Sequence, residues 1–284
     1  MKRITLGELC HPNARQLKAN EETMIDYIDI ASVDNVSKKI KGFQTMPFGE
    51  APSRARKSVQ NGSILVSTVR PNLNAVAILE EGTPNISVAS TGFCILDCKD
   101  STDKRFVFNF CKSKRFVNDM VSQATGASYP AVNDKIVRNS LVPAYSYEEQ
   151  CRIGQILDKV STLIETRTQE LKSLDDLIKA RFVELFGDIN INDKHWECEP
   201  LGELCTIVRG GSPRPIEQYL GGDVPWIKIG DATVGDNIYL SSTKEHIIQE
   251  GVKKSRLVKA GSLIFANCGV SLGFARIISF DGCI

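Results

Sequence analysis

The side chains that could perform covalent chemistry do not gather into a catalytic motif in this sequence. His195 and Cys198 are near each other, but no neighbouring residue completes a nucleophilic site. The triplet Glu170-Leu171-Lys172 mimics the Glu-x-Lys of nucleases, yet it lies on a predicted long helix with no Pro-Asp before it. The sequence contains no Gly-Lys dipeptide, which excludes a Walker A phosphate loop, and no Asn/Asp-Pro-Pro-Tyr/Phe signature of an amino-methyltransferase. We therefore expect no catalytic residue in this chain.

Metal chemistry has equally little support. The nine cysteines are scattered without a pair of Cys-x-x-Cys motifs, and the three histidines lie far apart. Cys94 and Cys98 come closest to a ligand pair, but the alternation around Phe93 and Ile95 marks them as strand residues. We expect no metal site, and reduced, mostly buried thiols.

Length and composition indicate a globular protein of about two domains. The chain has 284 residues, of which 42% are hydrophobic. No apolar stretch approaches the ~20 residues of a membrane span, and the N-terminus lacks the pattern of a signal peptide, so we expect a cytoplasmic protein. The net charge of +1 is unevenly distributed, because residues 1–145 carry 19 basic and 14 acidic side chains. This N-terminal excess permits nucleic-acid binding but is a weak signal.

The most informative feature is an internal repeat with an offset of 195 to 199 residues. The repeated order predicts two related α+β domains in tandem, at residues 1–145 and 191–284, with the second copy incomplete. Within the first copy we expect strands at Ile64–Val69, Ala75–Leu79 and Phe93–Leu96, and a helix over Phe106–Val121. The paired segments are Leu6–Cys10 with Leu201–Cys205, Tyr27–Ile30 with Trp226–Ile229, and Gly62–Val66 with Gly261–Phe265.

A long helix is predicted between the copies, within residues 146–190. Ser146 and Glu149 form a capping-box pattern after Pro143, and Gly187 is a natural C-terminal stop. About 40 helical residues would span roughly 60 Å. The apolar residues keep a heptad spacing that is interrupted by Arg167 and Arg181, which favours a coiled-coil seam over a single helix packed on a domain surface. The predicted seam residues are Ile153, Leu157, Val160, Ile164, Leu171, Leu174, Ile178 and Leu185.

Several short motifs occur in a fixed order along the chain, namely Leu6–Leu9 and Leu201–Leu204, Glu148–Gln150, Leu185–Asp188, Gly210–Pro213, Val224–Ile227 and Lys259–Ile264. With these motifs, the two related domains separated by a long helix resemble the DNA specificity subunits of type I restriction–modification systems, and the resemblance extends over essentially the whole chain. The usual Asp after the strand-opening Gly is replaced by Ser63 and Ser262, and the second conserved helix of the family is absent.

The resemblance implies a non-catalytic subunit whose recognition domains each read one half of a split DNA site. It implies partner modification subunits that bind S-adenosylmethionine and methylate adenine, and restriction subunits that use ATP and Mg²⁺, with no cofactor bound by this chain. An unpaired seam further predicts a homodimer through the long helix. The alternative that remains is a helical adaptor whose globular domains bind protein instead of DNA.

A DNA reader needs cations for phosphates and forked donors for base edges. Arg70–Asn74 is the first choice for base contact, with a surface turn capped by its Asn side chains as the alternative. Thr125–Pro130 is the second choice, with Tyr129 packed inward as its alternative, whereas Lys112, Lys114 and Arg115 are interpreted as a solvated helix face. The candidate DNA-contacting residues are Arg54, Arg56, Lys57, Arg70, Asn72, Asn74, Ser128, Tyr129 and Lys135 with Arg138 in the first copy, and Arg209, Arg214, Lys253, Lys254 and Arg256 in the second.

Overall fold

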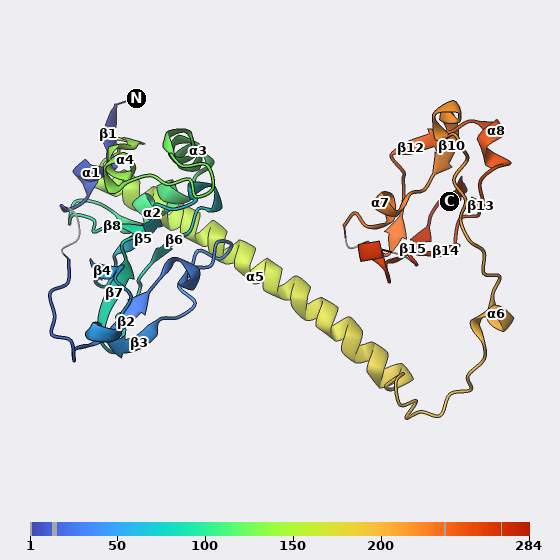
Figure 1. The fold of residues 1–284 in the computed structure, drawn as a ribbon, viewed down its shortest axis with the longest axis horizontal. Helices are drawn as coiled ribbons and strands as arrows, with labels where there is room; N and C mark the ends of the chain where they lie inside the picture. The colour runs from blue at the N-terminus through green and yellow to red at the C-terminus, as the bar shows by residue number, and fades with distance from the viewer. Residues whose placement is uncertain (1, 13–15, 236, 268) are drawn as a thin grey trace. The chain divides into compact units, whose positions relative to one another are not determined.

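The computed structural model describes residues 2–12, 16–235, 237–267 and 269–284. They form two compact units, an N-terminal unit, Met1–Leu185, and a C-terminal unit, Phe186–Ile284. Each unit combines short strands with short helices, and the N-terminal unit also contains one long helix (Figure 1). The predicted α+β class is therefore confirmed. Within the described residues, no helix combines the length and hydrophobicity that a membrane span requires.

Two small sheets form the centre of the N-terminal unit. The first has the strand order β3-β2-β7-β4, in which β2 and β7 are parallel and the other neighbours antiparallel. The second is antiparallel with the order β6-β5-β8. The predicted strands are confirmed, with β5 and β6 slightly shorter than expected. The bounds are β2 Met24–Ile28, β3 Gln44–Pro47, β4 Ala55–Ser58, β5 Ile64–Ser67, β6 Val76–Ile78, β7 Ile86–Ser90 and β8 Phe93–Leu96.

Two helices, α2 (Lys104–Lys112) and α3 (Lys114–Gln123), share a hydrophobic core with β5. The prediction of a single helix over residues 106–121 is wrong, because the chain breaks at Ser113. This residue has an extended backbone, and its Oγ accepts a hydrogen bond from the Phe116 amide at 3.2 Å, which starts a new helix. The remaining short elements are β1 Arg3–Thr5, α1 Leu6–Leu9, α4 Asp134–Asn139 and β9 Leu141–Pro143.

The predicted long helix is present as α5, Tyr147–Phe186, a continuous helix of 40 residues. Its start is the expected capping box: the Ser146 amide donates to Glu149 Oε2 at 2.9 Å, and the Glu149 amide donates to Ser146 Oγ at 3.3 Å. Gly187 follows the last turn with φ of 77°, a conformation that glycine adopts readily.

The C-terminal unit repeats the four-stranded sheet of the N-terminal unit, whereas its three-stranded sheet differs, because β11 and β15 are parallel and the N-terminal counterpart is antiparallel throughout. Its four-stranded sheet has the order β12-β10-β16-β13, with β10 and β16 parallel, as β2 and β7 are. Its three-stranded sheet has the order β11-β15-β14. The bounds are α6 Leu201–Leu204, β10 Leu220–Trp226, α7 Ile229–Ala232, β11 Tyr239–Leu240, β12 Glu245–Ile247, α8 Gln249–Val252, β13 Leu257–Val258, β14 Leu263–Phe265, β15 Ala275–Ile278 and β16 Gly282–Cys283.

Individual backbone hydrogen bonds also recur at an offset of 199 residues. Gly62 and Gly261 both have a left-handed backbone, with φ of 89° and 86°. Because the same turn and hairpin are formed twice by equivalent residues, the predicted duplication is a property of the fold as well as of the sequence. The equivalent bonds are Gly62 N to Leu79 O and Gly261 N to Ile278 O, both 2.7 Å, and Ser67 N to Ala75 O at 2.9 Å and Ala266 N to Phe274 O at 2.8 Å.

The eight described cysteines are free thiols, but fewer are buried than the composition suggested. Cys94 lies in β8, and Cys98 pairs with Cys10 in an isolated antiparallel bridge, so both are in strand-like backbone as predicted. Cys198 and Cys205 are exposed, because the segment around them is not packed into a core. Among the described residues, no three His, Cys, Asp or Glu side chains are grouped as metal ligands.

Candidate nucleic-acid interface

The turn Arg70–Asn74, here called the Arg70 turn, joins the antiparallel strands β5 and β6. Arg70 and Asn74 both have a left-handed backbone, with φ of 49° and 47°. The Leu73 amide donates to the Arg70 carbonyl at 2.9 Å, and the Asn74 amide donates to the Pro71 carbonyl at 3.0 Å. Such backbone strain in residues other than glycine is held only where the surroundings fix it, and it is concentrated at functional sites.

The structure brings the two preferred candidate segments together at this turn. The Arg70 amide donates to the Pro130 carbonyl at 2.7 Å, and the Arg70 guanidinium lies 4.7 Å from the centre of the Tyr129 ring. Tyr129 is 68% exposed, and Ser128 is exposed beside it, so the inward-packed Tyr129 considered above is not what the structure has. A guanidinium stacked on an exposed ring has a restricted orientation, and its N–H donors remain available to a base edge or a phosphate.

The two asparagines of the Arg70 turn have different surroundings. Asn74 matches the capping interpretation, because its side-chain amide donates to the Lys112 carbonyl at 3.4 Å and its own carbonyl accepts from Lys38 Nζ at 2.6 Å. Asn72 is exposed at the tip of the turn. Arg70 and Asn72 therefore point outward as candidate base-contacting residues, and Asn74 helps to hold the turn.

The basic residues of β4 and the loop before it are engaged within the protein to different degrees. The Lys57 ammonium lies 2.6 Å from Asp134 Oδ2 and 2.6 Å from the Phe93 carbonyl, in a partly buried position. This cation already has two acceptors and holds α4 against the sheets. Arg54, which lies 3.2 Å from an Asp29 oxygen, and Lys135 on α4 are exposed. Arg56, over the ring of Phe48, and Arg138 on α4, which donates to the His11 carbonyl, are only partly exposed.

The C-terminal unit carries its own cations. Residues 253–256 occupy the place of residues 54–57 at the offset of 199, directly before β13. Lys254 Nζ donates to the Tyr219 hydroxyl at 2.6 Å and lies 5.0 Å from the centre of its ring, whereas the segment at the place of the Arg70 turn, Gly269–Gly273, contains no basic residue. Arg209, Arg214, Lys253 and Arg256 are exposed.

Sequence reasoning missed Lys38 and misjudged Lys112. Both lysines are half-buried, and burial lowers the pKa of each side chain. Asn74 connects both to the Arg70 turn, because its carbonyl accepts from Lys38 Nζ and its side-chain amide donates to the Lys112 carbonyl. The Lys112 ammonium lies over the ring of Phe108 at 4.5 Å, so it is not simply a solvated helix face. The sequence did contain one signal of this loop, the turn-forming pair Asp34-Asn35, which precedes the left-handed Lys38.

Helix α5 is joined to the N-terminal unit along one face. The buried Gln150 side chain accepts from the Asp103 amide at 3.1 Å, and Asp158 lies 3.4 Å from Arg105 Nε. At Gly154 a Cβ atom would lie 2.7 Å from an Asp103 oxygen, so the close approach requires glycine. Glu165 pairs with Lys39 at 2.8 Å. These contacts orient the first turns of the helix relative to the Arg70 turn.

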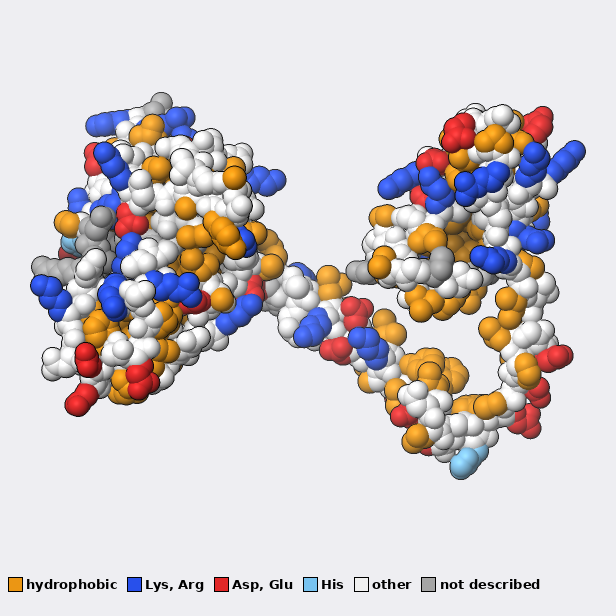
Figure 2. Space-filling model, viewed as in Figure 1, with side chains coloured by type: hydrophobic (Ala, Val, Ile, Leu, Met, Phe, Trp, Pro, Cys, Tyr) orange, Lys and Arg blue, Asp and Glu red, His pale blue; other side chains and the backbone are white. Residues whose placement is uncertain are grey.

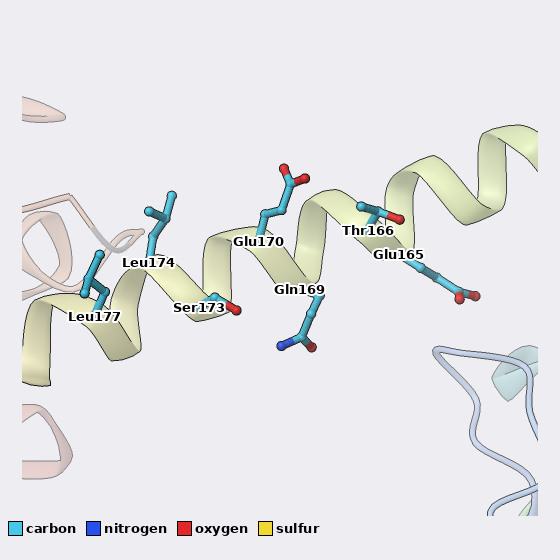
Figure 3. Close-up of a pocket in the computed structure, with 7 residues that line it drawn as sticks. All are labelled: Glu165, Thr166, Gln169, Glu170, Ser173, Leu174 and Leu177. Atoms are coloured by element: carbon cyan, nitrogen blue, oxygen red, sulfur yellow. The ribbon is translucent and has the colours of Figure 1, made fainter.

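The predicted seam of α5 is exposed beyond these contacts. Ile153 packs against the core, and the other seam residues are between 40% and 67% exposed. Figure 2 shows hydrophobic side chains lying among charged ones along the helix. A shallow surface depression lies along Glu165–Leu177, where Leu174 and Gln169 project from opposite edges of the helix (Figure 3). Arg167 and Arg181, which interrupt the seam, form ion pairs within the helix with Glu170 and Glu184.

A duplicated α+β module, an exposed Arg70–Tyr129 stack on its first copy and a long helix with an exposed apolar seam define a modular protein of two related domains and one long helix. The chain belongs to the type I restriction modification DNA specificity domain family, whose model matches residues 1–175. The family expected from the sequence motifs is thereby confirmed.

Individual relatives agree with this assignment. The MjaIX specificity subunit of Methanocaldococcus jannaschii is 23% identical over 232 residues, which cover 76% of this chain and 52% of that protein. The HindI specificity subunit of Haemophilus influenzae is 22% identical over 192 residues, which cover 66% of this chain and 41% of that protein. The chain thus spans about half the length of these curated relatives or less.

Solved structures show the same architecture. One from a study of complex assembly and conformational transition of the type I R-M system has a TM-score of 0.63 and 27% identity, and the match covers 100% of this chain and 73% of that chain. The HsdS subunit of Thermoanaerobacter tengcongensis has a TM-score of 0.53 and 25% identity with the same coverage. These matches support the α+β fold together with its long helix.

Proposed function

We propose that this chain is the sequence-specific DNA-recognition subunit of a type I restriction–modification complex. Residues 1–145 and 191–284 act as two recognition domains, and residues 146–190 act as the helical spacer between them. Family membership carries the proposal, and the exposed Arg70–Tyr129 stack supplies a concrete contact for a base pair in the duplex. In this proposal the protein acts in the cytoplasm, where its DNA substrate is found.

The chemistry in this proposal belongs to partner subunits. Modification subunits bind S-adenosylmethionine and methylate adenine, and restriction subunits hydrolyse ATP with Mg²⁺. The chain itself contributes recognition, with no cofactor and no catalytic residue of its own. The interaction-class alternative, a protein-binding adaptor, predicts no affinity for DNA even when these partners are present.

The exposed seam supports a second proposal, that two copies of the chain pair through α5. An apolar stripe of this length loses its contact with water when a second helix covers it, which is favourable in proportion to the area buried. Each copy would then supply one helix and its own N-terminal reader. A DNA motif read by such a two-fold pair would have two identical, inverted halves.

The test is co-purification of the chain with a modification subunit, followed by a gel-shift selection from random duplexes. The proposal predicts enrichment of a split motif that contains adenine, over the background retained by the modification subunit alone. A complex that assembles but enriches no sequence would overturn the DNA-recognition function and favour the adaptor.

A further inference from the structure

A loop that sequence reasoning did not single out lies beside the Arg70 turn. Residues 34–41 are here called the Asp34 loop. Val33, just before the loop, pairs with Ile40 near its end in an antiparallel bridge, and both side chains pack in the core. The Asp34 amide donates to the Lys39 carbonyl at 2.9 Å, and the Lys38 amide donates to the Asp34 carbonyl at 2.9 Å. The loop is therefore closed on itself at its base.

The Asp34 carboxylate organises the tip of this loop. One oxygen accepts from the Ser37 amide at 2.8 Å and from the Val36 amide at 2.7 Å, and the other lies 3.0 Å from Lys41 Nζ. Hydrogen bonds from Ser37, Lys41 and Val36 hold the pKa of Asp34 well below its ordinary value, so the carboxylate stays ionised. The tip conformation is thus formed in advance, which reduces the entropy lost when it binds a ligand.

The ordered tip presents an apolar side chain to solvent. Val36 is 92% exposed. A single exposed apolar residue is ordinary on a protein surface, but the backbone of this one is held by its hydrogen bond to Asp34, and it stands on a loop with three lysines and one aspartate. Apolar contact with a thymine methyl group is one of the ways in which proteins read the major groove.

The Asp34 loop is attached to the Arg70 turn and to α5. Lys38, whose φ is 58°, reaches the Asn74 carbonyl at 2.6 Å, so the loop and the end of the Arg70 turn are joined directly. Lys39 pairs with Glu165, and Lys41 pairs with Asp34, but both lysine side chains are more than 60% exposed. Exposed ion pairs are worth little, so a phosphate group can replace Glu165 as the acceptor of Lys39. Lys41 can likewise turn to a phosphate while the Asp34 carboxylate keeps its bonds from the Val36 and Ser37 amides.

We propose that the Asp34 loop is a second DNA-contacting element of the N-terminal unit, in which Val36 makes an apolar contact with a base edge and Lys39 and Lys41 contact the neighbouring phosphates. Lys38 acts as a positioning residue, since it fixes the loop against the Arg70 turn. This inference rests on the proposed DNA-recognition function and adds a specificity-determining residue to it.

The C-terminal unit differs at the position of Val36. Its equivalent loop, at the offset of 199, also meets the adjacent hairpin, where Arg276 Nη2 donates to the Gly235 carbonyl at 2.7 Å. Gly235 takes the place of Val36, and the exposed apolar residues of this loop, Val234 and Ile238, lie at other positions. A change at Val36 should therefore alter recognition at positions that the N-terminal unit reads.

The experiment uses the full chain with its modification subunit in the random-duplex selection. We expect Val36→Ala to weaken the preference at one base pair by roughly fivefold or more, since a single mismatch costs about 1–3 kcal/mol. Val183→Ala on α5 is the matched control, because Val183 is also exposed and lies far along the helix from the loop. Thermal unfolding should be unchanged in both variants.

Lys39→Gln and Lys41→Gln test the phosphate contacts separately. Each should reduce the slope of log affinity against log salt by about 0.9 without altering base preference. An enriched motif in the wild type with unchanged preference in Val36→Ala would overturn the Val36 contact alone, and unchanged salt slopes would overturn the phosphate contacts. Absence of any wild-type motif would instead refute the proposed function on which the inference rests.

Discussion

The apolar seam of α5 allows a quantitative prediction about self-association. Leu171 and Ile178 are 65% and 67% exposed. Complete burial of such a side chain stabilises by about 1.5–3 kcal/mol, so covering what is exposed contributes about 1–2 kcal/mol each. A symmetric helix pair buries four of these side chains, or about 4–8 kcal/mol. Replacing both residues with lysine should therefore raise the Kd of a homodimer by about a thousandfold or more.

The assay is analytical ultracentrifugation at micromolar concentration. Wild-type chain should sediment as a dimer, and the Leu171→Lys, Ile178→Lys variant as a monomer. The control is Thr162→Lys, Gln169→Lys, which adds the same charge at two exposed positions on the opposite side of the heptad pattern. A wild-type protein that sediments as a clean monomer, or a control that dissociates as completely as the seam variant, would refute the reasoning.

Three further outcomes are expected. Arg70→Gln should lower affinity for the selected motif by about 5- to 150-fold in a gel shift, since a bidentate contact to guanine contributes about 1–3 kcal/mol. Gly154→Leu should cost about 1–3 kcal/mol by overpacking against Asp103, seen as a lower midpoint of thermal unfolding. Burial raises the pKa of Asp26, but hydrogen bonds from Thr45 and Asn85 outweigh it and leave the pKa lowered. Stability should therefore fall as pH drops below about 4, and less steeply in Asp26→Asn by urea unfolding.

Local patterns accounted for much of the fold. Pro143, the Ser146 capping box and Gly187 delimit α5 because helix ends are determined by nearby residues. The duplication was visible because similar segments recur in the same order at an offset of 195 to 199 residues. The break at Ser113 was overlooked, although serine is a frequent N-cap, because the apolar spacing on both sides suggested one continuous helix.

The arrangement of the candidate interface required the tertiary structure. Arg70 and Tyr129 are 59 residues apart, and no sequence period relates them, yet the fold places one over the other. The ion pair of Lys57 with Asp134 likewise joins distant segments. Composition predicts that such residues are basic or aromatic, but only packing decides which cations already have a partner inside the protein.

The most direct test of the account is a spacer series in the selected DNA motif. If readers held at a fixed separation recognise the two halves, the complex should retain the motif whatever the sequence of its spacer. The amount of DNA retained should fall sharply when the spacer is lengthened or shortened by one base pair, because each base pair shifts the halves by about 3.4 Å and rotates them around the duplex. Retention that is independent of spacer length would contradict the claim that a helical spacer sets the distance between the readers.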